Sequence, residues 1–213
     1  NVNYVIPGFA TIYRSAVLKK LEIDTPGLLI EDFNLAFQFH KKKLGKIGYN
    51  FSIIGWDQYP NNLSDYIRQV RRWNIGFFQT VRHNGIWPSF FWVSLGVFSA
   101  EVMFNSVLIL FVPLVLIYHT LRLTGFIPAD IITLEFFVPY LELSIGDVVL
   151  GVFLVDYLVT VLIAIVKKRP QYLFYGLFFF FMHLVTSFIL ISSVVPGFFE
   201  HSSGRWTSPK RQE

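Results

Sequence analysis

The chain has 213 residues, of which 54% are apolar and 15% charged, and it contains no cysteine. Average soluble domains have about 25% charged residues. Together with a mean hydropathy of +0.51, these values exclude a disordered tail, a fibrous repeat and a disulfide-stapled secreted scaffold, and they indicate a membrane protein.

Charge divides the chain into two parts. Residues 1–86 contain 11 basic and six acidic residues, a net charge of +5, whereas residues 87–213 contain seven basic and eight acidic residues. We therefore expect a basic soluble domain over residues 1–86 and a transmembrane region over residues 87–213.

The first 86 residues alternate predicted strands, turns and helices, as in an α/β domain. β-Branched and aromatic residues favour strands, while acidic first turns and basic last turns favour helices. In chain order we expect a strand at Tyr4–Ile6, extended chain at Phe9–Arg14, a helix at Ser15–Leu21, a turn at Asp24–Gly27, a helix at Glu31–Leu44 ended by Gly45, a strand at Lys46–Ile54, and a helix at Ser64–Thr80 capped by Ser64.

Three apolar runs follow, at residues 102–121, 148–166 and 172–195. A helix needs about 20 residues to cross a hydrocarbon core of about 30 Å. We therefore expect an all-α region of about three membrane spans. The aromatic residues of Trp87–Trp92 and Tyr172 are typical of the membrane interface.

Basic flanks stay on the cytoplasmic side of a membrane. This rule places residues 1–86 and Lys167–Arg169 inside and the acidic loop over residues 130–147 outside. Three spans would then place the basic tail Arg205–Arg211 outside. Either the tail departs from the rule, or one apolar run is interfacial or re-entrant, and the sequence leaves both open.

Two features of the basic part bear on chemistry. Glu31 and Asp32 form an acidic pair at a predicted helix start, and Gln69, Arg72 and Trp73 form a Gln-x-x-Arg-Trp element. Taken alone, the acidic pair is equally typical of helix N-terminal electrostatics. The second element alone is equally typical of a basic amphipathic helix on anionic lipid.

In this order and ahead of apolar runs, the two features resemble the membrane-integrated family 2 glycosyltransferases, which include cellulose, chitin, hyaluronan and poly-N-acetylglucosamine synthases. The matching stretches are PGFATIYRSAVL, LLIEDFNLAFQFHKKKLGKIGYN and QYPNNLSDYIRQVRRWNIGFFQ. They lie within about residues 4–80, and the apolar runs and the terminal RWTSPKR are similar to that family's tail.

The resemblance implies part of a GT-A fold, an α/β domain, in which Asp32 is the general base. An inverting transfer needs a carboxylate that takes the proton of the attacking acceptor hydroxyl. Glu31 is expected to orient or cap the helix start. The resemblance also implies a nucleotide-sugar donor, a glycan or lipid-linked acceptor and surrounding membrane lipids, with no nucleic-acid partner.

The resemblance further assigns the Gln-x-x-Arg-Trp element to substrate binding. Arg72 would contact the donor diphosphate, where a guanidinium binds in bidentate fashion. Trp73 would offer a ring face to the acceptor sugar, and Gln69 a hydrogen-bonding group. Arg71 is an additional base that alternatively faces lipid headgroups. Gly8 matches a small residue before Tyr13-Arg14, where the lack of a Cβ permits close approach.

The family's donor-binding half, with the Asp-x-Asp that holds Mg²⁺ or Mn²⁺ on the diphosphate, is expected upstream of residue 1, since the sequence has no Asp-x-Asp. The start Asn1–Tyr4 also lacks the features of a signal peptide. We therefore expect a C-terminal half of a multi-pass plasma-membrane enzyme, inactive alone, with its catalytic part cytosolic. The chain is then either a fragment or a subunit whose other half is separate.

Two other functions stay open at this point. One is a catalytically silent membrane subunit that assembles with a partner, and the other, less favoured, is a piece of a transporter. Asp156 within an apolar run either lines a polar passage or pairs with Asn105 or His183. The five histidines are too scattered for a metal site.

Overall fold

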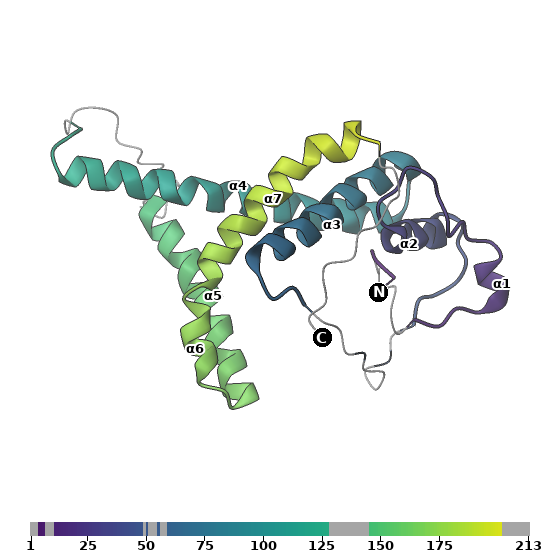
Figure 1. Cartoon of the computed structure of the whole chain (residues 1–213), viewed down its shortest axis with the longest axis horizontal. Helices are drawn as coiled ribbons and strands as arrows, with labels where there is room; N and C mark the ends of the chain where they lie inside the picture. Colours follow the sequence, from purple (N-terminus) through teal and green to yellow (C-terminus); the bar gives the residue numbers. More distant parts are fainter. Residues whose placement is uncertain are drawn as a thin grey trace. The chain divides into compact units, whose positions relative to one another are not determined.

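The computed structural model describes residues 4–6, 11–48, 50, 55, 59–127 and 145–201. Its regular secondary structure is helical (Figure 1). The helices are α1 (Ser15–Leu18), α2 (Glu31–Lys41), α3 (Leu63–Asn84), α4 (Phe90–Leu123), α5 (Ile145–Lys167), α6 (Gln171–Gly176) and α7 (Phe179–Phe199). Gly8, the acidic loop from residue 130 to 144 and the basic tail lie outside the described residues.

The predicted α/β class is wrong, because the described residues contain no strand. A strand is stable when a neighbouring strand pairs its N–H and C=O groups. Residues 4–6 and 11–14 are irregular instead, and the Ile6 N–H donates to the Asp32 carbonyl at 3.3 Å. Of the predicted strand at Lys46–Ile54, the described residues 46–48 and 50 are likewise irregular.

The chain forms two compact units. The first comprises residues 1–102 and 189–213, and the second comprises residues 103–188. The predicted domain boundary at residue 86 stays a prediction.

The core of the first unit is built around α2. One side of α2 contributes Leu35, Ala36 and Phe39 to a cluster with Ile6 and Leu21. The other side contributes Phe37, which is fully buried with Phe91 and Leu95. Because apolar residues occur on two sides of this short helix, α2 is enclosed by its neighbours.

The aromatic segment before α4 packs onto α2. The Phe37 ring lies 6.3 Å from Trp87 and 5.6 Å from Trp92, centroid to centroid. Trp87 also stacks on Phe91, at 5.5 Å. These tryptophans therefore have a packing role in the first unit.

Helix α2 ends three residues before its predicted limit. The Leu44 N–H donates to the Phe39 carbonyl and the Lys43 N–H to the His40 carbonyl, at 3.1 and 3.2 Å. This is a Schellman motif, whose αL residue is Lys43, with φ of 51°. The predicted terminator, Gly45, lies beyond it.

Helix α3 begins one residue before the predicted Ser64 and continues four residues past Thr80. Its cap is Asn62, whose side-chain oxygen accepts from the Asp65 N–H at 2.9 Å. Asp65 in turn pairs with Arg68. The hydrogen bond from Arg68 lowers the pKa of the Asp65 carboxyl.

Helices α2 and α3 lie side by side (Figure 1). At their contact, a Cβ added to Gly76 would lie 2.8 Å from Ile30 Cγ1, so any other residue there would require the Ile30 side chain to shift. One residue further along α3, the Phe77 ring packs 5.4 Å from Phe33. The first turn of α2 is thereby held against the middle of α3.

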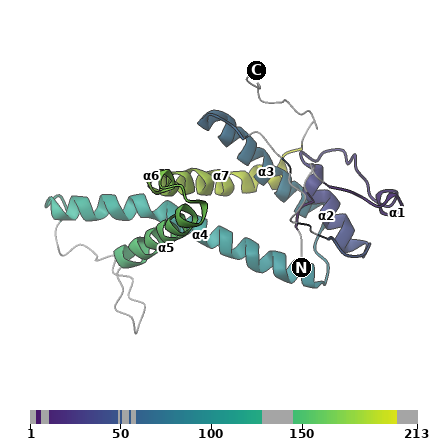
Figure 2. The same ribbon diagram turned by 90° about the horizontal axis from the view of Figure 1, so that it is seen from below.

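Three apolar helical regions match the predicted runs in part. Within the part of the chain that the structure describes, two helices, α4 and α7, are long and apolar enough to cross a membrane, judged by length and composition. Helix α5 covers the second run, but the third is divided between α6 and α7. Helices α5 and α6 are neighbours (Figure 2).

The close contact at Gly76 predicts the cost of adding a methyl group there. We expect Gly76→Ala to be less stable than Gly96→Ala by about 1–3 kcal/mol, because overpacking displaces Ile30. Gly96, on α4, has open space around its Cβ position, so its variant reports the helix-propensity gain alone. The measurement is denaturant unfolding in detergent, and equal stability of the two variants would contradict the packing described.

Candidate functional site

The acidic pair opens α2. The preceding residue, Ile30, is extended and gives no side-chain cap. Glu31 is exposed, whereas Asp32 is half-buried and its Oδ1 is buried. The unpaired N–H groups of a first helical turn favour a negative charge. The helix start therefore places the two carboxyl groups beside these N–H groups.

Tyr13 is the aromatic neighbour of this pair. Burial raises the pKa of the Tyr13 phenol, and the negative charges of Asp32 and Glu31 raise it further. Tyr13 also packs on the cluster that includes Ile6 and Leu35. The Tyr13 phenol therefore stays neutral and interacts electrostatically with the two carboxylates.

The Gln-x-x-Arg-Trp element occupies the N-terminal half of α3. Gln69 and Arg72 are half-buried, and Trp73 is 40% exposed. Residues three, four and seven positions apart share one face of a helix. Trp73, Arg72 and Gln69 precede Gly76 by three, four and seven residues, so they continue the face that meets α2.

The structure therefore packs residues that flank the two predicted motifs against each other. Ile30, which touches Gly76, directly precedes the acidic pair, and Phe33, which touches Phe77, directly follows it. Trp73 lies one helical turn before Phe77. Arg71 is exposed and does not belong to the face through Gly76.

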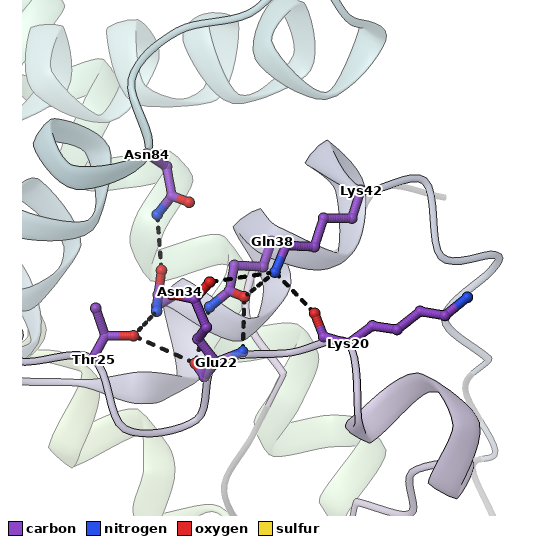
Figure 3. A network of polar contacts seen from close by, with 7 residues as sticks. All are labelled: Lys20, Glu22, Thr25, Asn34, Gln38, Lys42 and Asn84. Carbon is purple, nitrogen blue, oxygen red and sulfur yellow. Dashed lines mark hydrogen bonds and ion pairs between the residues drawn. The ribbon is translucent and has the colours of Figure 1, made fainter.

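Buried side-chain amides on α2 form hydrogen bonds to the loop that precedes this helix (Figure 3). Gln38 Oε1 accepts from the Glu22 N–H, and Gln38 Nε2 donates to the Glu22 carbonyl, both at 2.9 Å. The Lys42 ammonium donates to the same Gln38 oxygen at 3.0 Å. This two-way amide pairing fixes the loop at Glu22 against α2.

A second amide chain joins α2 to the end of α3. Asn34 Nδ2 donates to Thr25 Oγ1, and Asn34 Oδ1 accepts from Asn84 Nδ2, each at 2.9 Å (Figure 3). Asn34 is 1% exposed. A buried amide that lost its partner would cost about 1–3 kcal/mol, so this chain resists relative movement of α2 and α3.

Gln79 connects the loop before the acidic pair to the end of α7. Its Oε1 accepts from the Leu29 N–H at 3.1 Å, and its Nε2 donates to the Glu200 carbonyl at 3.5 Å. Arg82, one turn later, donates to the Phe198 carbonyl at 2.7 Å. Helix α3 thus contacts the C-terminal end of α7 as well as α2.

Sequence reasoning did not identify the roles of Tyr13 and Gln79. In the sequence, Tyr13 stands out only as a neighbour of Arg14, because its electrostatic interaction with the acidic pair joins separate segments. Gln79 carried one local signal, since it is a polar residue three positions after Gly76 on the face that meets α2.

The sequence is matched by one family. The model of the family described as Glycosyl transferase family group 2 matches residues 4–200. The chain belongs to this family. Comparisons with curated proteins and with solved structures give no match.

Membership makes the chain a glycosyltransferase, which implies a nucleotide-sugar donor and an acceptor. Both motifs lie inside the matched range. Among the described residues, no group of three or more His, Cys, Asp or Glu side chains is placed to hold a metal ion.

The electrostatic neighbourhood of Tyr13 gives a prediction that needs no substrate. We expect Asp32→Asn to lower the pKa of Tyr13, because it removes one negative charge that disfavours the phenolate. The pKa should stay above the ordinary value, since burial is the larger cause.

Tyrosine ring NMR during a titration at high pH measures this shift. Tyr66 is the internal control, because burial alone raises its pKa. Asp24→Asn, at an exposed acid, is the matched variant and should leave Tyr13 unchanged. An unchanged Tyr13 pKa in Asp32→Asn would contradict the placement of Tyr13 beside the pair.

Proposed function

We propose that this glycosyltransferase moves a sugar, with inversion, from a nucleotide-sugar donor to a glycan or lipid-linked acceptor. The observation that carries the proposal is the contact between Gly76 and Ile30, which holds the start of α2 beside the face of α3. In this proposal the half-buried carboxylate of Asp32 would act together with the guanidinium of Arg72 and the exposed indole of Trp73.

In the proposed reaction Asp32 is the general base. Its carboxylate takes the proton of an acceptor hydroxyl while that oxygen attacks the anomeric carbon of the donor sugar. The bond from the anomeric carbon to the diphosphate breaks, and its electron pair leaves with the nucleoside diphosphate. General-base assistance is typically worth 10²–10⁴-fold in rate. Glu31, which is exposed, would support the helix start.

The face of α3 would bind the substrates. Arg72 would contact the diphosphate, whose negative charge grows as it leaves. The exposed Trp73 ring would stack on an acceptor sugar, and Gln69 would hydrogen-bond to it. Gly8 would allow close approach of a substrate, and Arg71, which is exposed, would contact lipid headgroups.

Donor binding would also require a divalent cation, Mg²⁺ or Mn²⁺, with ligands outside these 213 residues. When bound, such an ion neutralises charge on the diphosphate. The proposal therefore includes an N-terminal half or partner chain that carries these ligands. Without it, the 213-residue chain would be inactive.

The proposed location is a multi-pass plasma-membrane protein with its catalytic part on the cytoplasmic face. The lengths and apolar compositions of α4 and α7 support membrane association. Only 22% and 17% of their most apolar stretches are buried. Exposed apolar surface of this kind is typical of contact with a membrane or with another protein.

Asp32→Asn tests the assignment of the base. In membranes that contain the complete enzyme, we expect a loss of at least about 10²-fold in transfer rate, because the amide accepts no proton. Binding of the product nucleoside diphosphate should be unchanged. The readout is incorporation of label from a panel of nucleotide sugars, with Asp24→Asn as the control.

A loss of less than about tenfold would place the base elsewhere. If the unmodified complete enzyme transferred no sugar from any donor, the alternative of a catalytically silent subunit would replace the proposal.

Substitutions on α3 separate donor from acceptor binding. We expect Arg72→Ala to slow transfer and weaken binding of the nucleoside diphosphate, and Trp73→Ala mainly to raise the acceptor concentration needed. Arg71→Ala, the matched exposed control, should cause only a mild, salt-sensitive loss. Steady-state kinetics with donor and acceptor varied separately measures these effects. Equal effects of the first two variants on acceptor affinity alone would contradict the division.

A further inference from the structure

The segment between α3 and α4 forms an open groove of about 510 Å³. Its lining is mostly apolar and consists of Ile86, Trp87, Pro88, Ser89, Trp92 and Val93. Two of these side chains are largely exposed, Ile86 at 80% and Val93 at 63%.

The wall of the groove is held in place by the core of the first unit. Trp87 stacks on Phe91 and meets Phe37 edge-on. The Ser89 hydroxyl donates to the Trp87 carbonyl and accepts from the Trp92 N–H, both at 3.3 Å. These contacts make the groove a preformed surface.

A positive charge lies at this wall. The Lys41 ammonium is 5.6 Å from the centre of the Trp87 ring. It also donates to the Asn84 carbonyl at 2.6 Å, two residues before the groove begins. A ligand in the groove would therefore combine an apolar part with an anionic group beside Lys41.

The groove continues into a helix that is apolar enough to cross a membrane. Helix α4 begins at Phe90, within the lining segment, and Phe90 is 76% exposed. Tryptophans at such a position are typical of the level of the lipid headgroups. We therefore expect bilayer lipid to be the amphiphile that contacts this groove.

The cation beside Trp87 favours the anionic phosphate of a bilayer phospholipid. Lysine binds phosphate as a point charge, without the geometric selectivity of the planar fork of arginine. The groove lining contains no arginine. Arg82, which precedes it, donates instead to the Phe198 carbonyl.

We propose that this groove binds an anionic glycerophospholipid, with an acyl chain along Ile86, Trp92 and Val93 and the phosphate beside Lys41. The site would anchor the first unit at the membrane surface. It uses no residue of the proposed catalytic site and is independent of the transfer reaction.

The test uses the complete protein in phosphatidylcholine nanodiscs that contain a fixed fraction of bromine-labelled lipid. Bromine on an acyl chain quenches tryptophan fluorescence on contact. One series contains brominated phosphatidylglycerol and the other brominated phosphatidylcholine. One lysine near a headgroup contributes about 1 kcal/mol, so we expect an apparent preference of about fivefold for phosphatidylglycerol.

The variants assign the preference to the groove. Lys41→Gln should abolish it, Lys41→Arg should keep it, and Lys19→Gln, at an exposed lysine on the end of α1, should leave it unchanged. Trp87→Phe should reduce the quenching signal. Circular dichroism checks that each variant retains its helices.

Equal quenching by the two lipids in the unmodified protein would overturn the proposal. A preference that survives Lys41→Gln would also overturn it, because the binding surface would then lie elsewhere. Displacement of brominated phosphatidylglycerol by an equimolar polyprenyl phosphate would overturn the assignment to a phospholipid.

Discussion

The close approach of Gly76 to Ile30 determines how the candidate site is assembled. A side chain at position 76 would separate α3 from the residue that leads into Glu31 and Asp32. Because Gly76 lies one turn after Arg72 and Trp73, the same contact brings the proposed base near the proposed substrate-binding face. Amide hydrogen bonds from Gln79 and Asn84 then fix the two helices further. The acidic pair thus depends on α3 for its position, although α2 carries it.

The same helix links the site to apolar parts of the chain. Helix α3 bonds to the end of α7 through Gln79 and Arg82. The segment that follows α3 packs Trp87 onto Phe37 of α2 and then enters α4. The site therefore lies within one packed unit that also contains the ends of two helices apolar enough for a membrane. A lipid bound beside Lys41 would contact this unit at Trp87.

Local signals predicted the helices better than they predicted the class of the fold. The start of α2 at Glu31 and the body of α3 follow from amphipathic periodicity and terminal charges. The end of α2 could not be predicted, because Lys43 adopts a conformation that glycine usually supplies. The strand predictions were wrong because a strand forms only when its backbone groups pair with a partner strand, which can lie far away in the sequence. The motif residues of the site were identifiable, whereas the neighbourhood of Tyr13 depends on tertiary contacts alone.

Cysteine cross-linking measures the central claim directly, since the natural chain has no cysteine. Phe33→Cys paired with Phe77→Cys should be joined by a short bifunctional thiol reagent, because the two rings meet between α2 and α3. Phe33→Cys paired with Leu63→Cys is the matched control, as position 63 lies 14 residues, or about 21 Å, earlier on the α3 axis. The account predicts efficient cross-linking of the first pair and little of the second. Cross-linking at position 63 without cross-linking at position 77 would contradict the packing of α2 on α3.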